Sequence, residues 1–160
     1  MKTHNYQTTI TWTGNLGQGT TNYKDYKRNH TITNPNKSQT ILASADPTFL
    51  GDDTRYNPEE LLLSSISSCH MLWYLHLCAT NNIIVTDYTD HAEGIMQENK
   101  DGSGQFTNVT LHPKVTVADA SMITKANQLH HKANTMCFIA RSCNFPITHN
   151  AFAEASPCKD

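Results

Sequence analysis

Two cysteines stand where their surroundings could make a thiol reactive. Cys69 lies within the apolar stretch 57–78, and Cys137 lies among the apolar residues of 136–139. The thiolate is the reactive form of cysteine, and with a free pKa of about 8.5 it is scarce at neutral pH unless positive charge or hydrogen bonds favour it. Two thiols in an apolar pocket can reduce a peroxide in two steps, because one sulfur becomes a sulfenic acid and the other condenses with it to a disulfide.

Serines precede Cys69 at a density that a plain core helix would not need. A serine hydroxyl inside a helix competes for backbone hydrogen bonds, so alanine would be the more stable choice there. Small side chains let another element approach closely and could donate a hydrogen bond to the sulfur. The alternative is that Cys69 is inert, because free cysteine is among the most buried residue types. The serines concerned are Ser64, Ser65, Ser67 and Ser68.

The other three cysteines differ in what they suggest. Cys143 is the rival partner for Cys69, because it follows Cys137 by only six residues. Cys78 lies nine residues beyond Cys69, which is about half a helical revolution out of phase at 3.6 residues per turn, so we expect it in the core. Cys158 is expected to be a frayed tail residue.

Histidines near the cysteines raise two further possibilities. As an imidazolium, His70 could add positive potential beside Cys69, although neighbouring helix positions point about 100° apart. His76 returns to roughly the face of Cys69 about 10 Å further along the axis, and we expect it to be a hydrogen-bonded packing residue.

A zinc site is the alternative from another class. Its ligands would come from two segments, but no Cys/His spacing in the chain fits a zinc module, and there is no CxxC motif. Neither a metal nor a cofactor is therefore predicted. The candidate ligands are Cys69, His70, His130, His131 and Cys137.

Length and composition restrict the class of protein. A chain of 160 residues fits a single domain over residues 1–160. A net charge of −2 without a basic cluster argues against nucleic acid as a partner. The apolar runs are shorter than the roughly 18 residues of a membrane span, and the first residues carry no signal-peptide pattern. Five cysteines, an odd number, favour reduced thiols over a disulfide framework. We expect a soluble cytoplasmic protein.

The N-terminal third has the pattern of short strands. Residues 6–13 alternate apolar and polar side chains, which predicts a half-buried strand. Strand-like segments follow at 20–26, 30–33 and 39–44, so an antiparallel meander is expected.

A long helix is predicted to follow this meander. Asn57 is a good N-cap, Pro58 suits the first helical position, and the helix should run to about residue 80. Because apolar residues occupy several of its faces, it is expected to lie at the centre of the molecule, nearly surrounded.

The rest of the chain predicts a hairpin of two long strands, 83–98 and 106–117, and a second helix over 119–136. A short helix at 137–143 and a last edge strand within 144–154 complete an α+β domain.

Glu59 and Glu60 complement the positive end of the long helix, which is an ordinary role for acidic residues there. Glu59 precedes Cys69 by ten residues, about 15 Å of helix rise. If both act on one small substrate, the chain must bend or a second subunit must supply one of them. This indicates a dimer.

Two segments resemble the OsmC/Ohr proteins, the osmotically inducible and organic hydroperoxide resistance family. NPEELLLSSISSCHML, residues 57–72, resembles the family's helix that carries its first cysteine. KANTMCFIARSCNFPI, residues 132–147, resembles its second-cysteine segment, although Phe138 stands where the family usually has proline. The order of elements also agrees over essentially the whole chain.

The resemblance implies an intertwined homodimer in which antiparallel sheets from both chains wrap around two central helices. It implies a peroxidase for alkyl or lipid hydroperoxides, with Cys69 as the peroxidatic thiol and Cys137 as the resolving thiol. A dithiol such as a lipoyl group would reduce the resulting disulfide. The alternatives are an apolar-ligand binding protein of the same fold with inert thiols, or the metal-binding protein.

An arginine that activates the thiolate, partnered by Glu59, is also implied. A guanidinium suits this role because it stays charged and offers a planar fork of donors. Of the three arginines in the chain, we favour Arg28, which is in the N-terminal meander, with Arg55 beside the glutamates as the alternative.

Overall fold

The computed structural model describes residues 2–157, so Cys158 and its expected fraying lie outside the described residues. These residues fall into two compact units, divided between Leu61 and Leu62. The class is α+β, as predicted. A single domain over the whole chain stays a prediction.

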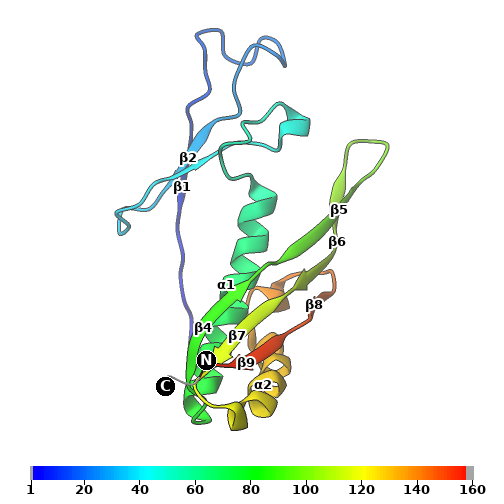
Figure 1. The fold of residues 1–160 in the computed structure, drawn as a ribbon. Coiled ribbons are helices and arrows are strands. Elements are labelled where there is room, and N and C mark those ends of the chain that lie inside the picture. The colour runs from blue at the N-terminus through cyan, green and yellow to red at the C-terminus, as the bar shows by residue number, and fades with distance from the viewer. Residues whose placement is uncertain (1, 158–160) are drawn as a thin grey trace. The chain divides into compact units, whose positions relative to one another are not determined.

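The first unit contains an antiparallel three-stranded sheet (Figure 1), whose strands are β1 (Thr9–Trp12), β2 (His30–Thr33) and β3 (Ile41–Ala43). The predicted meander is therefore confirmed, but 20–26 forms turns and bends and not a strand.

The prediction that β1 is half-buried is wrong, because all four of its residues are exposed, Ile10 by 58%. The alternation of apolar and polar residues predicts that one face of the strand is apolar. It does not predict whether another part of the protein covers that face. A 3-10 turn, η1 (Pro47–Phe49), follows the sheet.

Helix α1 (Pro58–Thr80) begins where the sequence predicts. The Asn57 side-chain oxygen accepts a hydrogen bond from the Glu60 backbone N–H at 2.8 Å, and the Glu60 carboxylate accepts one from the Asn57 N–H at 3.1 Å. This reciprocal pair is a capping box, which satisfies two backbone donors at the helix start.

The second unit contains two three-stranded sheets. One has the order β4 (Val85–Asp90), β7 (Pro113–Val117), β9 (Phe152–Ala155), and the other β5 (Glu93–Glu98), β6 (Gly104–Leu111), β8 (Ile147–His149).

The predicted hairpin partners do pair, but each long strand is broken into two, so that its halves belong to different sheets. A cause is visible at the break: the Asp90 carboxylate accepts a hydrogen bond from the His112 backbone N–H at 2.7 Å. Pro113 follows and has no N–H to donate to a ladder.

The last strands correct the prediction of purely antiparallel sheets. The predicted single edge strand is two strands, and β8 and β9 pair in parallel with β6 and β7. Parallel pairing needs a crossover of a dozen or more residues. Helix α2 (Ile123–Met136), with the 3-10 turns η2 (Ala120–Met122) and η3 (Ala140–Ser142), provides it.

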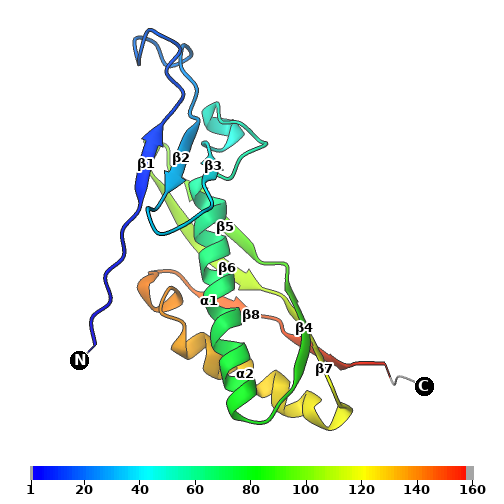
Figure 2. The ribbon, with the colours of Figure 1, turned by 90° about the vertical axis from the view of Figure 1, so that its left-hand side faces the viewer.

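Helix α1 buries only a narrow stripe within this chain. The buried residues follow one another at four-residue steps and are Ile66, His70, Tyr74 and Cys78. Figure 2 looks onto the side of α1 that faces away from β6 and β8. Of the other residues of α1, Leu72 is 63% exposed. The prediction that the helix is nearly surrounded is therefore wrong for a single chain.

Among the described residues α1 is also the one helix long and apolar enough to cross a membrane. Core helices of soluble proteins pass the same test of length and composition.

Candidate thiol site

Cys69 and Cys137 lie next to each other in the second unit. Cys69 is half-buried in the middle of α1, Cys137 is completely buried, and neither forms a disulfide. Burial, together with a hydrogen bond to the Cys69 thiol, raises the pKa of Cys137 to about 11. A hydrogen bond raises the pKa of an acid when it stabilises the protonated form. Burial and the neighbouring Cys69 thus favour a Cys137 thiol that keeps its proton.

The end of α2 positions Cys137. The cysteine is the C-cap of the helix, and its backbone is extended, with φ −66° and ψ 113°. The chain then turns back through η3, so the Ala140 backbone N–H donates to the Cys137 sulfur at 3.3 Å. This donor opposes the effect of burial on the Cys137 pKa.

A groove of about 540 Å³ runs along the Cys69 side of α1. The sequence suggested that serines donate hydrogen bonds to the sulfur. Two serines of the groove donate instead to carbonyl oxygens of their own helix. Ser65 donates to Leu62 at 2.7 Å and Ser68 to Ser65 at 3.2 Å. The groove is lined by Ser65, Ser68, Cys69, Leu72, Trp73, His76, Phe138 and Ile139.

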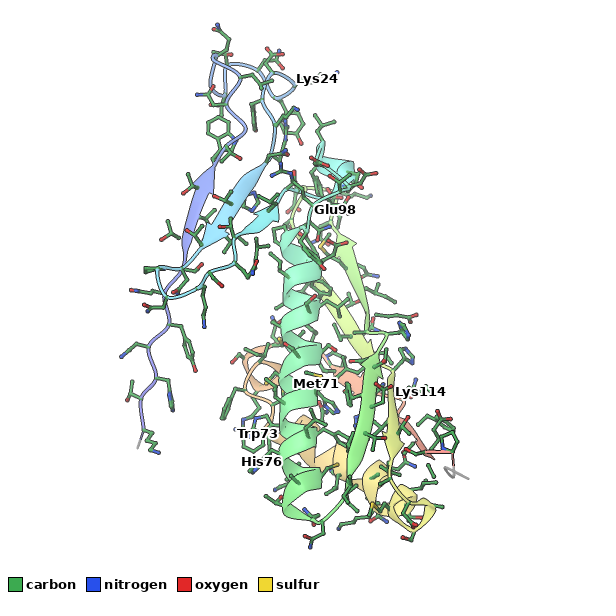
Figure 3. All side chains as sticks on the ribbon, turned by 60° about the vertical axis from the view of Figure 1, so that its left-hand side comes forward. Lys24, Met71, Trp73, His76, Glu98 and Lys114 are labelled. Carbon is green, nitrogen blue, oxygen red and sulfur yellow. The ribbon has the colours of Figure 1, made fainter. Side chains whose placement is uncertain are left out.

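Aromatic rings form one wall of the groove. The Trp73 ring meets the Phe138 ring edge to face, with centroids 5.6 Å apart, and the His76 ring in the same manner at 5.8 Å. Trp73 and His76 project from the same side of α1 (Figure 3). His76 is exposed and packs against Trp73 as expected, but its ring makes no hydrogen bond among the described residues, so the expectation of a hydrogen-bonded ring is wrong. Phe138, 67% exposed, extends the wall.

Three histidines from α1, α2 and β8 meet in the second unit, and sequence reasoning missed this cluster. His70 of α1 and His130 of α2 are buried, and His70 Nε2 lies 3.0 Å from His130 Nδ1. The His149 ring of β8 is centred 5.6 Å from His70, and the Tyr74 ring stacks on His130 at 3.8 Å. The available signal was the four-residue spacing that puts His70 on the buried stripe with Tyr74.

These histidines are kept neutral by their surroundings. Burial, with His149 as a second cause, lowers the pKa of His70 to about 4. Burial, then His70 and His149, lowers the pKa of His130 to about 3. A hydrogen bond between two imidazoles needs one ring nitrogen without a proton, which a neutral pair provides. The idea that His70 supplies positive potential beside Cys69 is therefore wrong.

The other described cysteines lie in apolar surroundings. Cys78 is buried, as predicted, and burial raises its pKa. Cys143 packs against the core cluster of Ile66, Val109 and Leu111, and its thiol donates to the Ile139 carbonyl oxygen at 3.3 Å. Cys69 is a cause of the raised pKa of Cys137, whereas burial alone raises the pKa of Cys143. Which of the two acts as the resolving thiol stays a prediction.

The candidate zinc ligands do not form a metal centre. Over residues 2–157 no group of three or more histidine, cysteine, aspartate or glutamate side chains is arranged to hold a metal ion. His70 and His130 come together, but they share a hydrogen bond with each other.

The residues predicted to activate the thiol belong to the first unit. The Arg28 guanidinium lies 4.2 Å from the ring centroids of both Tyr23 and Tyr26 and donates to the carbonyl oxygens of the same two residues. Arg55 pairs with Asp52 at 3.3 Å. Glu59 is half-buried in the first turn of α1. Their roles toward the thiols stay predictions.

Comparison with known proteins gives a consistent result. A family model described as OsmC-like protein matches residues 51–151. An OsmC-like protein of unknown function from Vibrio cholerae is 30% identical, with a TM-score of 0.82 over 94% of this chain and 100% of that one. No curated protein sequence gives a significant match.

More distant structures share the fold. An organic hydroperoxide resistance protein OsmC from Legionella pneumophila is 16% identical, with a TM-score of 0.66 over 95% of this chain and 99% of that one. One from Elizabethkingia anophelis is 18% identical, with a TM-score of 0.64 over 98% and 100%.

The histidine cluster predicts how stability depends on pH. Because the folded state depresses the pKa values of His70 and His130 below 6.5, the unfolded chain binds more protons in acid. The contribution of these two histidines to the free energy of unfolding is complete above pH 6.5. It is lost as the pH falls toward 4 for His70 and toward 3 for His130. Between pH 7 and pH 5 the free energy of unfolding should fall by roughly 2 kcal/mol for each of them.

Urea unfolding of the intact chain at several pH values measures this loss. His130→Gln should flatten the dependence, whereas His131→Gln, at an exposed neighbour, is the matched control. Equal slopes in the two variants would contradict the role of the cluster.

Proposed function

The chain belongs to the OsmC-like family, and on that basis we propose that it is a thiol-dependent peroxidase that reduces organic hydroperoxides. The observation that carries the proposal is the contact between the Cys69 and Cys137 thiols beside an apolar groove. The names of the Legionella and Elizabethkingia proteins agree with this reaction class.

In the first step the Cys69 thiolate attacks the distal oxygen of the hydroperoxide. A sulfur–oxygen bond forms, the oxygen–oxygen bond breaks, and the alkoxide takes up a proton and leaves as an alcohol. Cys69 is oxidised to a sulfenic acid, while the substrate is reduced. The groove holds the organic part of the substrate against Leu72, Trp73 and Phe138.

In the second step the Cys137 sulfur attacks the Cys69 sulfenic acid. A disulfide forms, and the hydroxyl group leaves as water with the proton of the Cys137 thiol. A raised pKa suits Cys137 to this order of events, because a protonated second thiol does not compete for the peroxide. A dithiol of the lipoyl type then reduces the disulfide to two thiols, which completes the cycle in a reducing cytoplasm.

An arginine and Glu59 complete the proposed site. A guanidinium close to the sulfur would favour the thiolate, and Glu59 would orient the guanidinium. Arg28 is the first candidate and Arg55 the second. Arg28 has five N–H donors, of which its own loop uses two, so donors remain for a further partner.

We also propose that two chains form a homodimer. Helix α1 is apolar around most of its circumference, yet only four of its residues are buried within the chain. Exposed apolar side chains occur on the sheets as well, at Ile10, Ile95 and Phe152. A second copy of the chain would cover these surfaces, which a soluble monomer rarely exposes in continuous patches.

The second candidate is an apolar-ligand binding protein with inert thiols. The groove favours it, because its volume lies within the range of about 300–1,000 Å³ that small-molecule sites occupy. Labelling of the protein with a sulfenic-acid probe after mild peroxide separates the two candidates, since an inert cysteine does not react.

Substitution of each thiol tests the peroxidase. With cumene hydroperoxide and dihydrolipoamide, Cys69→Ser should abolish turnover, because no thiol remains to cleave the oxygen–oxygen bond. Cys137→Ser should accumulate the Cys69 sulfenic acid, detected by the same probe. Cys78→Ser is the matched control and should keep full activity. Peroxidase activity of Cys69→Ser at the level of the unmodified protein would refute the assignment.

A paired comparison identifies the activating arginine. In a variant that keeps Cys69 as its only cysteine, alkylation by iodoacetamide at pH 7 reports the thiolate. Arg28→Ala should slow alkylation about tenfold or more, because loss of a nearby positive charge commonly raises a thiol pKa by at least one unit. Arg55→Ala should leave it nearly unchanged. The reverse result would assign the role to Arg55, and no effect in either variant would refute both candidates.

Sedimentation equilibrium tests the dimer. Two chains of 17.9 kDa should sediment together at micromolar concentration, because the exposed apolar faces are large. A single-chain mass at all concentrations would show that these faces have no partner copy.

A further inference from the structure

Helices α1 and α2 meet through two buried imidazoles. Figure 2 shows α2 crossing behind α1 at an angle. At this crossing His70 Nε2 lies 3.0 Å from His130 Nδ1, and the two ring planes are within 5° of each other. The ring centroids are 5.3 Å apart although the two nitrogens are only 3.0 Å apart, so the rings lie edge to edge and not face to face. This arrangement gives a nearly straight hydrogen bond, which is the favoured geometry.

Little else on α2 holds the two helices in register. His130 is the largest of the completely buried side chains of α2, and Tyr74 stacks on its ring. Two stacked flat rings can slide past each other, whereas a hydrogen bond weakens steeply as its angle and distance change. Within residues 2–157 no other hydrogen bond joins α1 to residues 123–136. The other buried residues of α2 are Ala126, Leu129 and Ala133.

Both candidate thiols are attached to this crossing. Cys69 is the residue before His70 in α1. On the other helix His130, Ala133 and Cys137 are completely buried and follow one another at steps of three and four residues, so they share one side. Cys69 is close enough to Cys137 to raise its pKa. A small movement of α2 along or around its axis therefore changes the distance between the two sulfurs.

Disulfide formation tolerates little change in that distance. The bond needs Cβ atoms about 3.5–4.5 Å apart, and a misplacement of about 1 Å can slow a reaction between positioned groups about 100-fold. Attack on a hydroperoxide has no such requirement, because the substrate approaches Cys69 by diffusion. The two steps of the proposed cycle therefore differ in how strongly they depend on the position of α2.

We propose that His70 and His130 are positioning residues for the second step of this cycle. Their hydrogen bond holds α2 where the Cys137 sulfur reaches the Cys69 sulfenic acid, and it has no part in the first step. The inference rests on the proposed function, because a hydroperoxide forms the sulfenic acid. If the disulfide closes slowly, a second hydroperoxide oxidises the sulfenic acid to a sulfinic acid and is itself reduced to an alcohol. The histidine pair thus protects Cys69 from irreversible oxidation.

Two variants at position 70 isolate the hydrogen bond. His70→Gln places an amide where the imidazole has Nε2, and this amide can either donate to His130 or accept from it. His70→Met places a methyl group there, and both residues suit a helix interior equally well. His130→Asn and His130→Leu are the corresponding pair on α2, because an asparagine amide stands where Nδ1 does. This second pair is used if urea unfolding shows that a variant at position 70 does not fold.

Rapid mixing of the reduced full-length protein with excess cumene hydroperoxide follows the two steps separately. A sulfenic-acid probe and peptide mapping by mass spectrometry report the state of residue 69 and the peptide that joins it to residue 137. His70→Met should form the sulfenic acid at the rate of the unmodified protein, close the disulfide about tenfold more slowly and accumulate about tenfold more sulfinic acid per turnover.

His70→Gln should recover most of the rate of disulfide closure. His131→Gln, at an exposed histidine of α2, is the control and should behave as the unmodified protein. Equal rates of closure in His70→Met and His70→Gln would overturn the proposal. So would equal slowing of both steps in His70→Met, which would indicate a structural role alone.

A redox equilibrium separates this inference from the proposed function, because it needs no hydroperoxide. In glutathione buffers the fraction of chains with the joined peptide gives the reduction potential of the thiol pair. The disulfide should be about tenfold easier to reduce in His70→Met than in His70→Gln, which is a potential about 30 mV higher. If the unmodified protein does not react with cumene hydroperoxide but the potentials differ, the peroxidase is refuted and the positioning of the thiols stands. If it reacts and the potentials agree, the positioning is refuted and the peroxidase stands.

Discussion

The contact between α1 and α2 is the constraint on which the candidate site depends. A hydrogen bond of 3.0 Å joins His70 to His130, and the Tyr74 ring stacks on His130 at 3.8 Å. Each helix brings one of the two candidate thiols next to a histidine of this contact or to the end of its helix: Cys69 precedes His70, and Cys137 is the C-cap of the helix that contains His130. At least one of the two imidazoles must stay neutral, because the bond needs a ring nitrogen without a proton, and a charge on either ring would lie in an apolar interior.

Helix α1 separates two environments by its faces. One stripe joins the core through Ile66, His70 and Tyr74, while Cys69 and Trp73, rotated away from it, line the groove. The thiol therefore has access to an apolar compound without disturbing the core. The serines have a different use from the one expected, since the Ser65 and Ser68 hydroxyls donate to carbonyl oxygens of the helix itself and not to the groove.

The sequence allowed prediction of the elements with local signals. Asn57 and Pro58 mark the start of α1 because capping depends on neighbouring residues, and the meander and the second helix follow from periodicity. Features that depend on distant contacts were missed. The break of the long strands arises from the Asp90 contact with the His112 backbone, and the parallel pairing of β8 and β9 from the crossover through α2. Cys69 and Cys137 could be singled out from their apolar neighbours, and the resemblance implied their roles, whereas the histidine cluster needs three elements to meet.

The most direct test of the central claim follows the thiols of the unmodified protein. One equivalent of cumene hydroperoxide is added to the reduced protein, and peptides are mapped by mass spectrometry without reduction. If Cys69 and Cys137 act together, two thiols disappear per chain and a peptide that joins residues 69 and 137 accumulates. An unchanged thiol count, or a disulfide that joins Cys69 to Cys143, would contradict the account.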